Sequence, residues 1–360
     1  MTNLVANLPI NSVSFGNVSV TLLRAAFEKG LSSTIFPIGG VDVSSYTFDE
    51  TFGKWLEKGI NFSYEKHSRS NPVLKLWHLN GSLESFSSDQ ILLTFHELDQ
   101  LTSSEVNAIK NQKLVLVTSE YTKRVCLDYG LTNVEVIKLG FDKWSFRRRD
   151  KSYFNDGRIT FGISGKYEPV RKRHEKTIRA WIKRFGNDRR YFLQCSLFNP
   201  FRKLEELKQD WFNLVDGKKP FNVEFLSPIE KNVDYNEFLN SNDIIVDMGT
   251  ESWGLPLFQS LAIGKHGVAL DAAGHKSFAN NQNCVLVQPN AKIPAYDGFF
   301  FHPGAPFNQG NVFDFEEEAF IHACEESIKR VESNKVNGEG MKLQETHSAD
   351  KSLGEILKFL

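Results

Sequence analysis

The chain has 360 residues, of which 41% are hydrophobic and 24% are charged, and its formal net charge at pH 7 is −1. This composition excludes a disordered or fibrous protein, and the length predicts two domains, because single hydrophobic cores stop growing near roughly 250–300 residues. No apolar run approaches the ~20 residues that span a bilayer, the first residues lack the pattern of a signal peptide, and the four cysteines form no CxxC motif. We therefore expect a cytoplasmic protein.

The charges are unevenly distributed along the chain. Residues 143–190 contain 16 Lys and Arg against five Asp and Glu, whereas the rest of the chain carries 27 basic and 39 acidic side chains. A local surplus of positive charge is typical of a protein with a phosphate-bearing partner. A solvated helix face followed by a linker accounts for the same charges, so both interpretations stay open.

The first part of the chain alternates strand-like and helix-like segments. Apolar runs predict strands at Asn3–Leu8, Ser33–Ile38, Gln90–Phe95, Lys113–Val117 and Val134–Leu139. A spacing near 3.6 residues predicts helices at Val18–Glu28, which closes at Gly30, and at Glu120–Tyr129, which ends at Gly130. Strands that alternate with helices predict an open α/β sheet.

A second α/β series follows residues 140–157, which lack periodicity and are the best linker candidate. Strands are expected at Arg158–Ile163, Arg190–Cys195, Val223–Leu226, Asp243–Asp247, Gly267–Leu270 and Cys284–Val287. Helices are expected at His174–Phe185, Leu255–Ala262, Phe315–Glu332 and Ser352–Leu360. The predicted domains are 1–145 and 155–340, both Rossmann-like, and ligands bind such sheets at the carboxyl ends of the strands.

Residues 241–289 read SNDIIVDMGTESWGLPLFQSLAIGKHGVALDAAGHKSFANNQNCVLVQP. This segment resembles the donor-binding half of retaining glycosyltransferases with the GT-B fold, in particular glycosyltransferase family 4. Phe161–Ala180 and Val115–Gly140 resemble further motifs of that family, so the similarity extends over most of residues 90–290. The resemblance implies an α/β GT-B fold, with two Rossmann-like domains facing each other across a cleft and a terminal helix within 346–360 that crosses back to the first domain.

The resemblance implies that the second domain binds a nucleotide-diphosphate sugar, with a UDP-sugar favoured. In the family, the first acid of a Glu-x7-Glu pair binds the donor sugar and the second binds the ribose hydroxyls. Here Glu251 matches the first acid, but Gln259 replaces the second and lacks the charge-assisted strength of a carboxylate. Gly254 lets the backbone approach a ligand, and Leu255 with Pro256 opens a helix whose unpaired N–H groups favour anions.

Lys166 and Lys172 match the positions of the family's cations that neutralise the donor diphosphate. The register between them differs by one residue, so Arg171 or Arg173 is an alternative to Lys172. Preorganised cations stabilise the negative charge that develops on the leaving diphosphate.

In the first domain, His96 follows the apolar run Gln90–Phe95 and matches a family histidine close to the donor hexose. Gly16 and Asn17 stand between the first strand and the first helix, where the family has a glycine turn near the donor phosphate and the acceptor. We expect catalytic roles for His96, Lys172 and Glu251. We expect donor contacts from Gly16, Asn17, Lys166, Lys172, Arg173, Gly254, Leu255, Pro256 and Gln259.

The resemblance implies transfer of a hexose to a hydroxyl group with retention of configuration, without a protein nucleophile, a metal ion or a cofactor. The implied acceptor is a glycan or a lipid-linked glycan. The basic segment 143–190 leaves open a nucleic-acid partner, namely hydroxymethylated bases in viral DNA. Gln259 leaves open a catalytically silent protein that binds sugar nucleotides or glycans. The aromatic stretch Tyr296–Phe315 fits either a wall of the cleft or packing between the domains.

Overall fold

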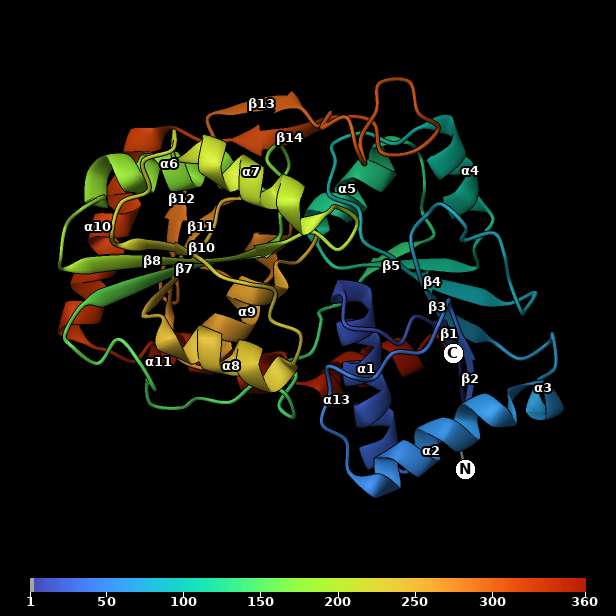
Figure 1. Cartoon of the computed structure of the whole chain (residues 1–360). Coiled ribbons are helices and arrows are strands. Elements are labelled where there is room, and N and C mark those ends of the chain that lie inside the picture. Colours follow the sequence, from blue (N-terminus) through green and yellow to red (C-terminus); the bar gives the residue numbers. More distant parts are fainter. Residues whose placement is uncertain (1–2) are drawn as a thin grey trace. The chain divides into compact units, whose positions relative to one another are not determined.

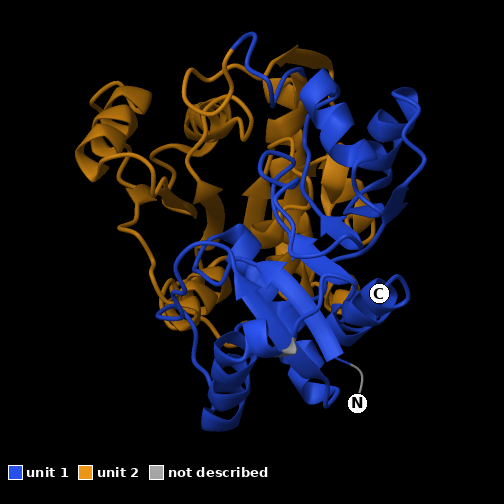
Figure 2. Cartoon of the chain, turned by 90° about the vertical axis from the view of Figure 1, so that its right-hand side faces the viewer, with its two compact units in different colours: residues 1–145, 303–310, 344–360 blue, residues 146–302, 311–343 orange. Residues whose placement is uncertain are grey.

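The computed structural model describes residues 3–360, and the chain forms two compact units, coloured separately in Figure 2. Unit 1 contains residues 1–145, 303–310 and 344–360, and unit 2 contains residues 146–302 and 311–343. The chain therefore passes from one unit to the other at 145/146, 302/303, 310/311 and 343/344.

Unit 1 is built on a six-stranded sheet in which every pair of neighbouring strands is parallel, in the order β2-β1-β3-β4-β5-β6. Short apolar runs form these strands because parallel strands are covered on both faces. Their bounds are β1 Asn3–Leu8, β2 Ser32–Pro37, β3 Val73–Leu76, β4 Gln90–Leu93, β5 Leu114–Val117 and β6 Val134–Val136.

The helices of unit 1 cover this sheet. They are α1 Ser14–Glu28, α2 Glu50–Asn61, α3 Ser63–Lys66, α4 Ser103–Lys110, α5 Glu120–Asp128 and α13 Ala349–Leu357, and the short α12 Leu343–Thr346 lies at the last passage between the units. The side chain of Thr102 accepts a hydrogen bond from the Glu105 amide, and the Glu105 carboxylate accepts one from the Thr102 amide, so a capping box starts α4. The late helix α13 packs against α1, and Phe141 pairs with Ser348, which fixes the end of the chain onto unit 1.

Unit 2 contains a second six-stranded parallel sheet, in the order β12-β11-β10-β7-β8-β9. The bounds are β7 Ile159–Lys166, β8 Tyr191–Phe198, β9 Val223–Phe225, β10 Ile244–Asp247, β11 His266–Leu270 and β12 Val285–Val287. A two-stranded antiparallel hairpin, β13 Ala291–Pro294 and β14 Asn311–Asp314, lies outside this sheet.

Figure 1 shows α6 and α7 on one face of the unit 2 sheet and α8 and α9 on the other. The helices are α6 His174–Phe185, α7 Leu204–Leu214, α8 Asn232–Ser241, α9 Leu255–Ala262, α10 Glu317–Ser333 and α11 Gly338–Met341, with a short 3₁₀ helix η1 at Ala273–Ser277. Apolar side chains of α6, α7 and α10 form one core with β7, β8 and β10, in which Trp181 and Phe320 are fully buried.

The predicted α/β class, with two parallel sheets in series, is confirmed. The predicted bounds of α6 and α9 agree with the structure, whereas α1 begins four residues earlier than expected. Gly16 and Asn17 therefore lie in the first turn of α1 and not in a turn that precedes it. Among the described residues, no helix combines the length and the apolar character needed to cross a membrane.

Candidate functional site

The order of the strands in unit 2 points to the carboxyl edge of β7 and β10. From β7 the chain builds outward through β8 and β9, and then returns to add β10, β11 and β12 on the other side of β7. The neighbouring strands β7 and β10 thus flank a topological switch point, where α/β sheets bind their ligands. Lys166 is the last residue of β7 and Asp247 the last of β10, so polar side chains occur at this edge.

Five charged side chains form a continuous row at this edge, which we call the ionic cluster: Lys166, Glu168, Arg171, Lys172 and Glu251. Lys172 Nζ lies 2.5 Å from Glu251 Oε1, and Arg171 Nη1 lies 3.3 Å from the same oxygen. Arg171 Nη2 also lies 2.6 Å from Glu168 Oε2, and Lys166 Nζ lies 2.6 Å from Glu168 Oε1. Three cations and two carboxylates leave one surplus positive charge in the row.

Both carboxylates of the ionic cluster are buried, and both are ionised at neutral pH. Burial by itself raises the pKa of Glu251, but the charges of Lys172 and Arg171 outweigh burial and hold that pKa below its ordinary value. For Glu168, burial likewise raises the pKa, and the charges of Arg171, Lys166 and Lys172 lower it further than burial raises it. The two carboxylates therefore carry fixed negative charges and are not proton donors near pH 7.

A second buried pair supports the loop that carries Glu251. Asp247 Oδ2 lies 3.4 Å from His275 Nε2, and His275 Nδ1 lies 3.0 Å from the carbonyl oxygen of Leu270. Burial raises the pKa of Asp247, but the charge of His275 overcomes it and brings the pKa down to about 2. Burial lowers the pKa of His275, and the Asp247 carboxylate reverses this effect, so the pKa of His275 is raised. The pair is an ion pair at mildly acidic pH.

Glycine is required where the loop after β10 meets this pair. Gly254 has a φ of +97°, and a Cβ there would lie 2.7 Å from His275 Nε2. At Gly249 a Cβ would lie 3.0 Å from both Glu251 Oε1 and the Cα of Lys172. Any larger residue at these two positions would push the loop away from the ionic cluster.

Helix α9 starts at this loop and presents its amino terminus to the edge. Gly254 is its N-cap residue and offers no side-chain cap, and Pro256 lies in its first turn. Leu255 is half-buried. Gln259, one turn further on, is 5% exposed, and its Oε1 has no hydrogen-bond partner among the described residues. A buried acceptor without a partner costs free energy, so this oxygen is suited to a ligand hydroxyl group.

Of the basic candidates, Lys166 and Lys172 belong to the ionic cluster, and Arg171 is also a member. Arg173 adopts a left-handed conformation with a φ of +54° at the N-cap of α6. Its guanidinium donates to Asp314 Oδ1 from Nε and Nη2, at 3.1 and 2.8 Å. Arg173 is therefore engaged by the β13–β14 hairpin and not by Glu251.

The candidate residues of unit 1 make contacts within their own unit. His96 is buried, lies three residues beyond the end of β4, and its Nε2 is 3.0 Å from the carbonyl oxygen of Gln100. Asn17 Oδ1 accepts a hydrogen bond of 2.9 Å from the Tyr46 hydroxyl. A Cβ at Gly16 would lie 2.1 Å from the carbonyl oxygen of Asn11, so close packing of that loop on α1 demands glycine.

Sequence reasoning missed three residues of the unit 2 site: Glu168, Asp247 and His275 in their paired roles. One signal was present for Glu168, since it is the only acid in the otherwise basic stretch 158–174. The pairing of Asp247 with His275 joins residues that are far apart in the chain, and no local pattern announces it.

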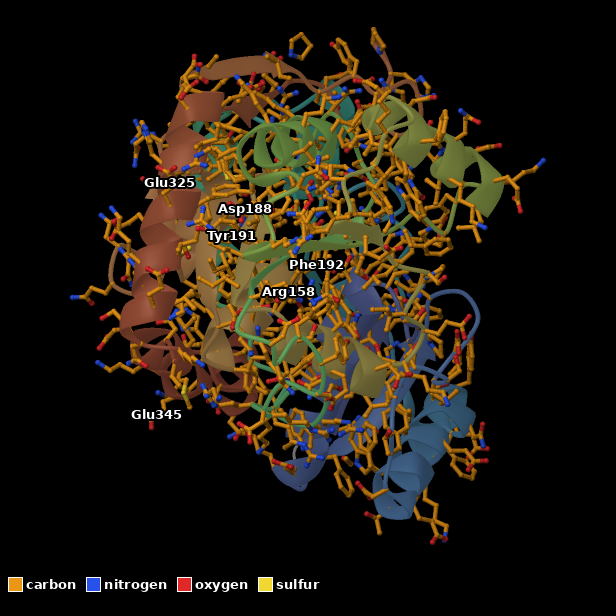
Figure 3. The ribbon with its side chains drawn as sticks, turned by 60° about the vertical axis from the view of Figure 1, so that its left-hand side comes forward. Arg158, Asp188, Tyr191, Phe192, Glu325 and Glu345 are labelled. Atoms are coloured by element: carbon orange, nitrogen blue, oxygen red, sulfur yellow. The ribbon has the colours of Figure 1, made fainter. Side chains whose placement is uncertain are left out.

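The basic segment 143–190 is largely neutralised in the folded chain. At least thirteen of its sixteen Lys and Arg side chains make ion pairs, and most of their partners lie outside the segment. Figure 3 labels Asp188 and Glu325, which pair with Arg190 and Arg184 at 2.7 Å each. The surplus of positive charge in the sequence of residues 143–190 therefore does not produce an equally large surface of unpaired cations.

A scan of protein-family models finds no match to the sequence, and a search of curated protein sequences finds none either. Solved structures match over the whole chain at low identity. Sucrose-phosphate synthase from Thermosynechococcus elongatus is 13% identical with a TM-score of 0.64, and the match covers 99% of this chain and 98% of that one.

HepE from Anabaena, in complex with UDP and glucose, is 14% identical with a TM-score of 0.66, and both chains are covered completely. The catalytic domain of starch synthase IV from Arabidopsis thaliana, bound to ADP and acarbose, is 11% identical with a TM-score of 0.68, covering 100% of this chain and 98% of that one. At these identities the likeness establishes the fold: this chain has the GT-B fold of glycosyltransferases.

Proposed function

We propose that the chain is a retaining glycosyltransferase that moves a hexose from a nucleotide-diphosphate sugar, with UDP-sugars favoured, to a hydroxyl group of an acceptor. One observation carries the proposal: the ionic cluster lies at the switch point of the unit 2 sheet, beside the loop and helix that present Glu251 and Gln259. The structural neighbours that contain UDP with glucose or ADP with acarbose support the same donor class.

In this proposal unit 2 binds the donor through the groups of the ionic cluster and α9. Lys166, Lys172 and the amino terminus of α9 at Gly254, Leu255 and Pro256 face the diphosphate, because cations and unpaired N–H groups favour phosphate oxygens. Glu251 accepts hydrogen bonds from hydroxyl groups of the sugar. The partnerless Oε1 of Gln259 accepts one from the ribose.

The chemistry requires a bond from the sugar C1 to the diphosphate to break while a bond from the acceptor oxygen to C1 forms on the same face. The electron pair of the broken bond goes to the diphosphate oxygen, where the nearby cations stabilise it. The acceptor proton passes to that same leaving oxygen. This route needs no protein nucleophile and no cofactor, and the lysines take the charge-neutralising role that a metal ion has in other transferases.

Lys172 also holds Glu251 in place before the donor arrives. Its Nζ is 2.5 Å from Glu251 Oε1, and both side chains are buried. A lysine has three donors, so Lys172 can keep this contact and still bind a phosphate oxygen. The carboxylate is therefore oriented without the cost of ordering it on donor binding.

Unit 1 supplies the acceptor side in this proposal, with Gly16, Asn17 and His96 as its candidate contacts and a glycan or lipid-linked glycan as acceptor. The neutralised basic segment weakens the motive for a nucleic-acid acceptor. The alternative is a catalytically silent protein that binds sugar nucleotides, and a turnover assay distinguishes it from a transferase.

The experiment is a donor screen with purified protein. UDP-, ADP- and GDP-hexoses are incubated with and without mixed oligosaccharide and lipid-linked acceptors, and free nucleoside diphosphate is measured. We expect release from at least one donor, increased by an acceptor and unchanged by a metal chelator. Binding of donor without release under every condition would support the silent protein instead.

A further inference from the structure

We propose that Phe201, Phe299 and Phe300 form the surface on which the nucleobase of the donor stacks. These three residues are called the phenylalanine cluster. The inference rests on the proposed function and deepens it, because it names the part of unit 2 that contacts the base. Phe299 and Phe300 belong to the aromatic stretch 296–315, which has no role in the proposed contacts with the diphosphate or the sugar.

The phenylalanine cluster adjoins the ionic cluster. Lys166 Nζ lies 3.9 Å from the ring centroid of Phe300 and 5.8 Å from that of Phe201. Phe201 follows β8, whose last residue Phe198 pairs with Lys166 at the end of β7. The rings therefore lie at the same carboxyl edge as the cations proposed for the diphosphate. A nucleoside diphosphate has its base one ribose away from its phosphates, so such rings are within reach of the base.

Two of the three rings present much of their surface to solvent. Phe201 is 61% exposed and Phe299 is 46% exposed. The centroids of Phe201 and Phe300 are 5.6 Å apart at an interplanar angle of 81°, and those of Phe299 and Phe300 are 4.5 Å apart at 83°. An edge-to-face contact covers at most one face of a ring. Lys166 lies over Phe300, so the faces offered to a planar base are those of the exposed Phe201 and Phe299, and a base gains free energy by stacking on such a face.

Hydrogen bonds fix the loop of Phe299 and Phe300 before any ligand binds. Asp297 Oδ1 accepts from the backbone amides of Phe299, Phe300 and Phe301 at 2.9, 2.8 and 2.9 Å. Gly298 has a φ of +72°, which this tight turn requires, and Phe301 is buried as its anchor. The aromatic residues are thus presented by an ordered loop.

The loop of Phe201 is fixed independently. The Phe201 amide donates to Asn199 Oδ1 at 3.1 Å, and Asn199 Nδ2 donates to the carbonyl oxygen of Tyr167 at 3.2 Å. Asn199 is buried. Because both loops are set in advance, little conformational entropy is lost when a base stacks.

The phenylalanine cluster lies at one end of the ionic cluster, and this position favours the nucleobase of the donor over its sugar as the group that the rings contact. The order of contacts is Phe300, Lys166, Glu168, Arg171 and Glu251. Glu251, the proposed partner of the sugar, is at one end of this row, and the phenylalanine cluster is at the other. A donor with its diphosphate on the cations would place its sugar and its base toward opposite ends.

Calorimetric titration tests this inference with UDP, ADP and inorganic pyrophosphate as probes. The double variant Phe201→Ala/Phe300→Ala should lose about tenfold or more in affinity for UDP and ADP, since stacking on an aromatic side chain contributes that much. Its affinity for pyrophosphate, which has no base, should stay unchanged. Phe212→Ala is the matched control, because Phe212 is 59% exposed on α7 and lies outside the cluster. Phe201→Trp should keep the wild-type affinity.

Two outcomes would overturn the inference while the proposed function survives. The first is wild-type affinity of the double variant for UDP and ADP. The second is an equal loss for pyrophosphate and for the two nucleotides. If the wild-type protein binds none of the three probes, the proposed function fails together with this inference.

Discussion

Gln259 is the residue at which this chain departs from the acid pair of the family it resembles. The variant Gln259→Glu should tighten UDP binding by roughly fivefold, because hydrogen bonds to a charged acceptor are about 1 kcal/mol stronger than neutral ones. It should also lower the melting temperature of the unliganded protein, since an unpaired carboxylate would be buried. Titration calorimetry and thermal unfolding, with and without UDP, measure the two effects.

The matched control is Gln194→Glu. Gln194 is buried in β8, and its amide donates to Ser241 and Asn242. The Gln194→Glu variant should have a lower melting temperature than the wild type but the same affinity for UDP. Unchanged affinity of Gln259→Glu for every nucleoside diphosphate would remove Gln259 from the ribose site.

The pair of Asp247 and His275 makes a pH-dependent contribution to stability. The pKa of His275 is raised, so its contribution is fully present below the unfolded value near 6.5 and is lost as pH rises through the folded value. The pKa of Asp247 is lowered to about 2, so its contribution is present above about 4 and is lost as pH falls toward 2. The ion pair therefore stabilises the fold most between about pH 4 and 6.5.

His275→Gln should thus lower the melting temperature by several degrees at pH 6 and by less at pH 9, because the contribution of a group with a raised pKa is lost as the pH rises. Thermal unfolding at both pH values measures the difference. Lys276→Gln is the control, because Lys276 pairs with Asp271 at the surface and should shift the midpoint little at either pH. Equal shifts for His275→Gln at pH 6 and pH 9 would contradict an ionic pair.

Burial of the charged site residues is the feature that sequence patterns do not convey. Neither Glu251 nor Lys172 lies in an apolar run. This sequence context predicts that both side chains are exposed and that replacing them leaves the stability of the fold unchanged. In the structure each is only 8% exposed, and they are each other's partner. Glu251 also has Arg171 at 3.3 Å, so it is the removal of Glu251 that takes away the ion-pair partner of a buried charge, Lys172, at a cost of about 3–5 kcal/mol. Variants at these positions need a stability measurement beside the activity measurement.

At the level of elements, the loop that starts α9 depends on Gly254. Gly254→Ala should destabilise the protein by more than the ~1–2 kcal/mol that a left-handed conformation costs an alanine, because its Cβ also meets His275. It should weaken UDP binding as well, since Gly254 is the N-cap residue of α9, whose amino terminus is proposed to face the diphosphate. Chemical unfolding and calorimetry measure the two effects.

Gly157→Ala is the control for backbone strain alone. Gly157 has a φ of +89°, close to that of Gly254, but a Cβ at Gly157 would meet no atom within 4 Å. We expect a loss of ~1–2 kcal/mol and an unchanged UDP affinity. Equal effects of the two alanines would show that contact with His275 is unimportant.

The elements that are predictable have strong local signals. Helices α6 and α9 both show apolar periodicity. Gly186 follows α6, Gly254 precedes α9, and Pro256 lies in the first turn of α9. Strand β3, Val73–Leu76, is missed because Lys75 interrupts its apolar run. The structure buries Lys75 by letting its Nζ donate to the carbonyl oxygens of Gly81 and Glu84, a solution that a sequence pattern does not show.

For the whole molecule, the two α/β series predict two sheets, but chain segments that return late are harder to place. Residues 303–310 belong to unit 1, where the Thr102 hydroxyl donates to the carbonyl oxygen of Pro306 at 2.7 Å. The Asn308 amide donates to Glu105 Oε1 at 2.9 Å. These contacts join residues that are 204 and 203 positions apart, so no periodicity within the stretch reveals them.

The charge of the whole molecule bears on the acceptor. Because most cations of the segment 143–190 are paired, a duplex containing hydroxymethylcytosine should show no retardation in a gel at physiological salt, and no hexose mass when donor is added. A parallel reaction with oligosaccharide or lipid-linked acceptors is the control. Salt-sensitive retardation together with a gain of hexose mass would make DNA the acceptor.

The central claim is that the ionic cluster and Glu251 act on a nucleotide sugar. The most direct measurement follows donor turnover by phosphorus NMR for the wild type and Glu251→Gln, with melting temperature and UDP affinity determined for both. We predict that the wild type converts a nucleotide hexose to the nucleoside diphosphate. The folded variant should be more than about tenfold slower, because it loses a charged hydrogen bond to the sugar, while its UDP affinity changes by less than about threefold. Equal rates for the two proteins, or a wild type that binds UDP and never releases it from any donor, would contradict the account.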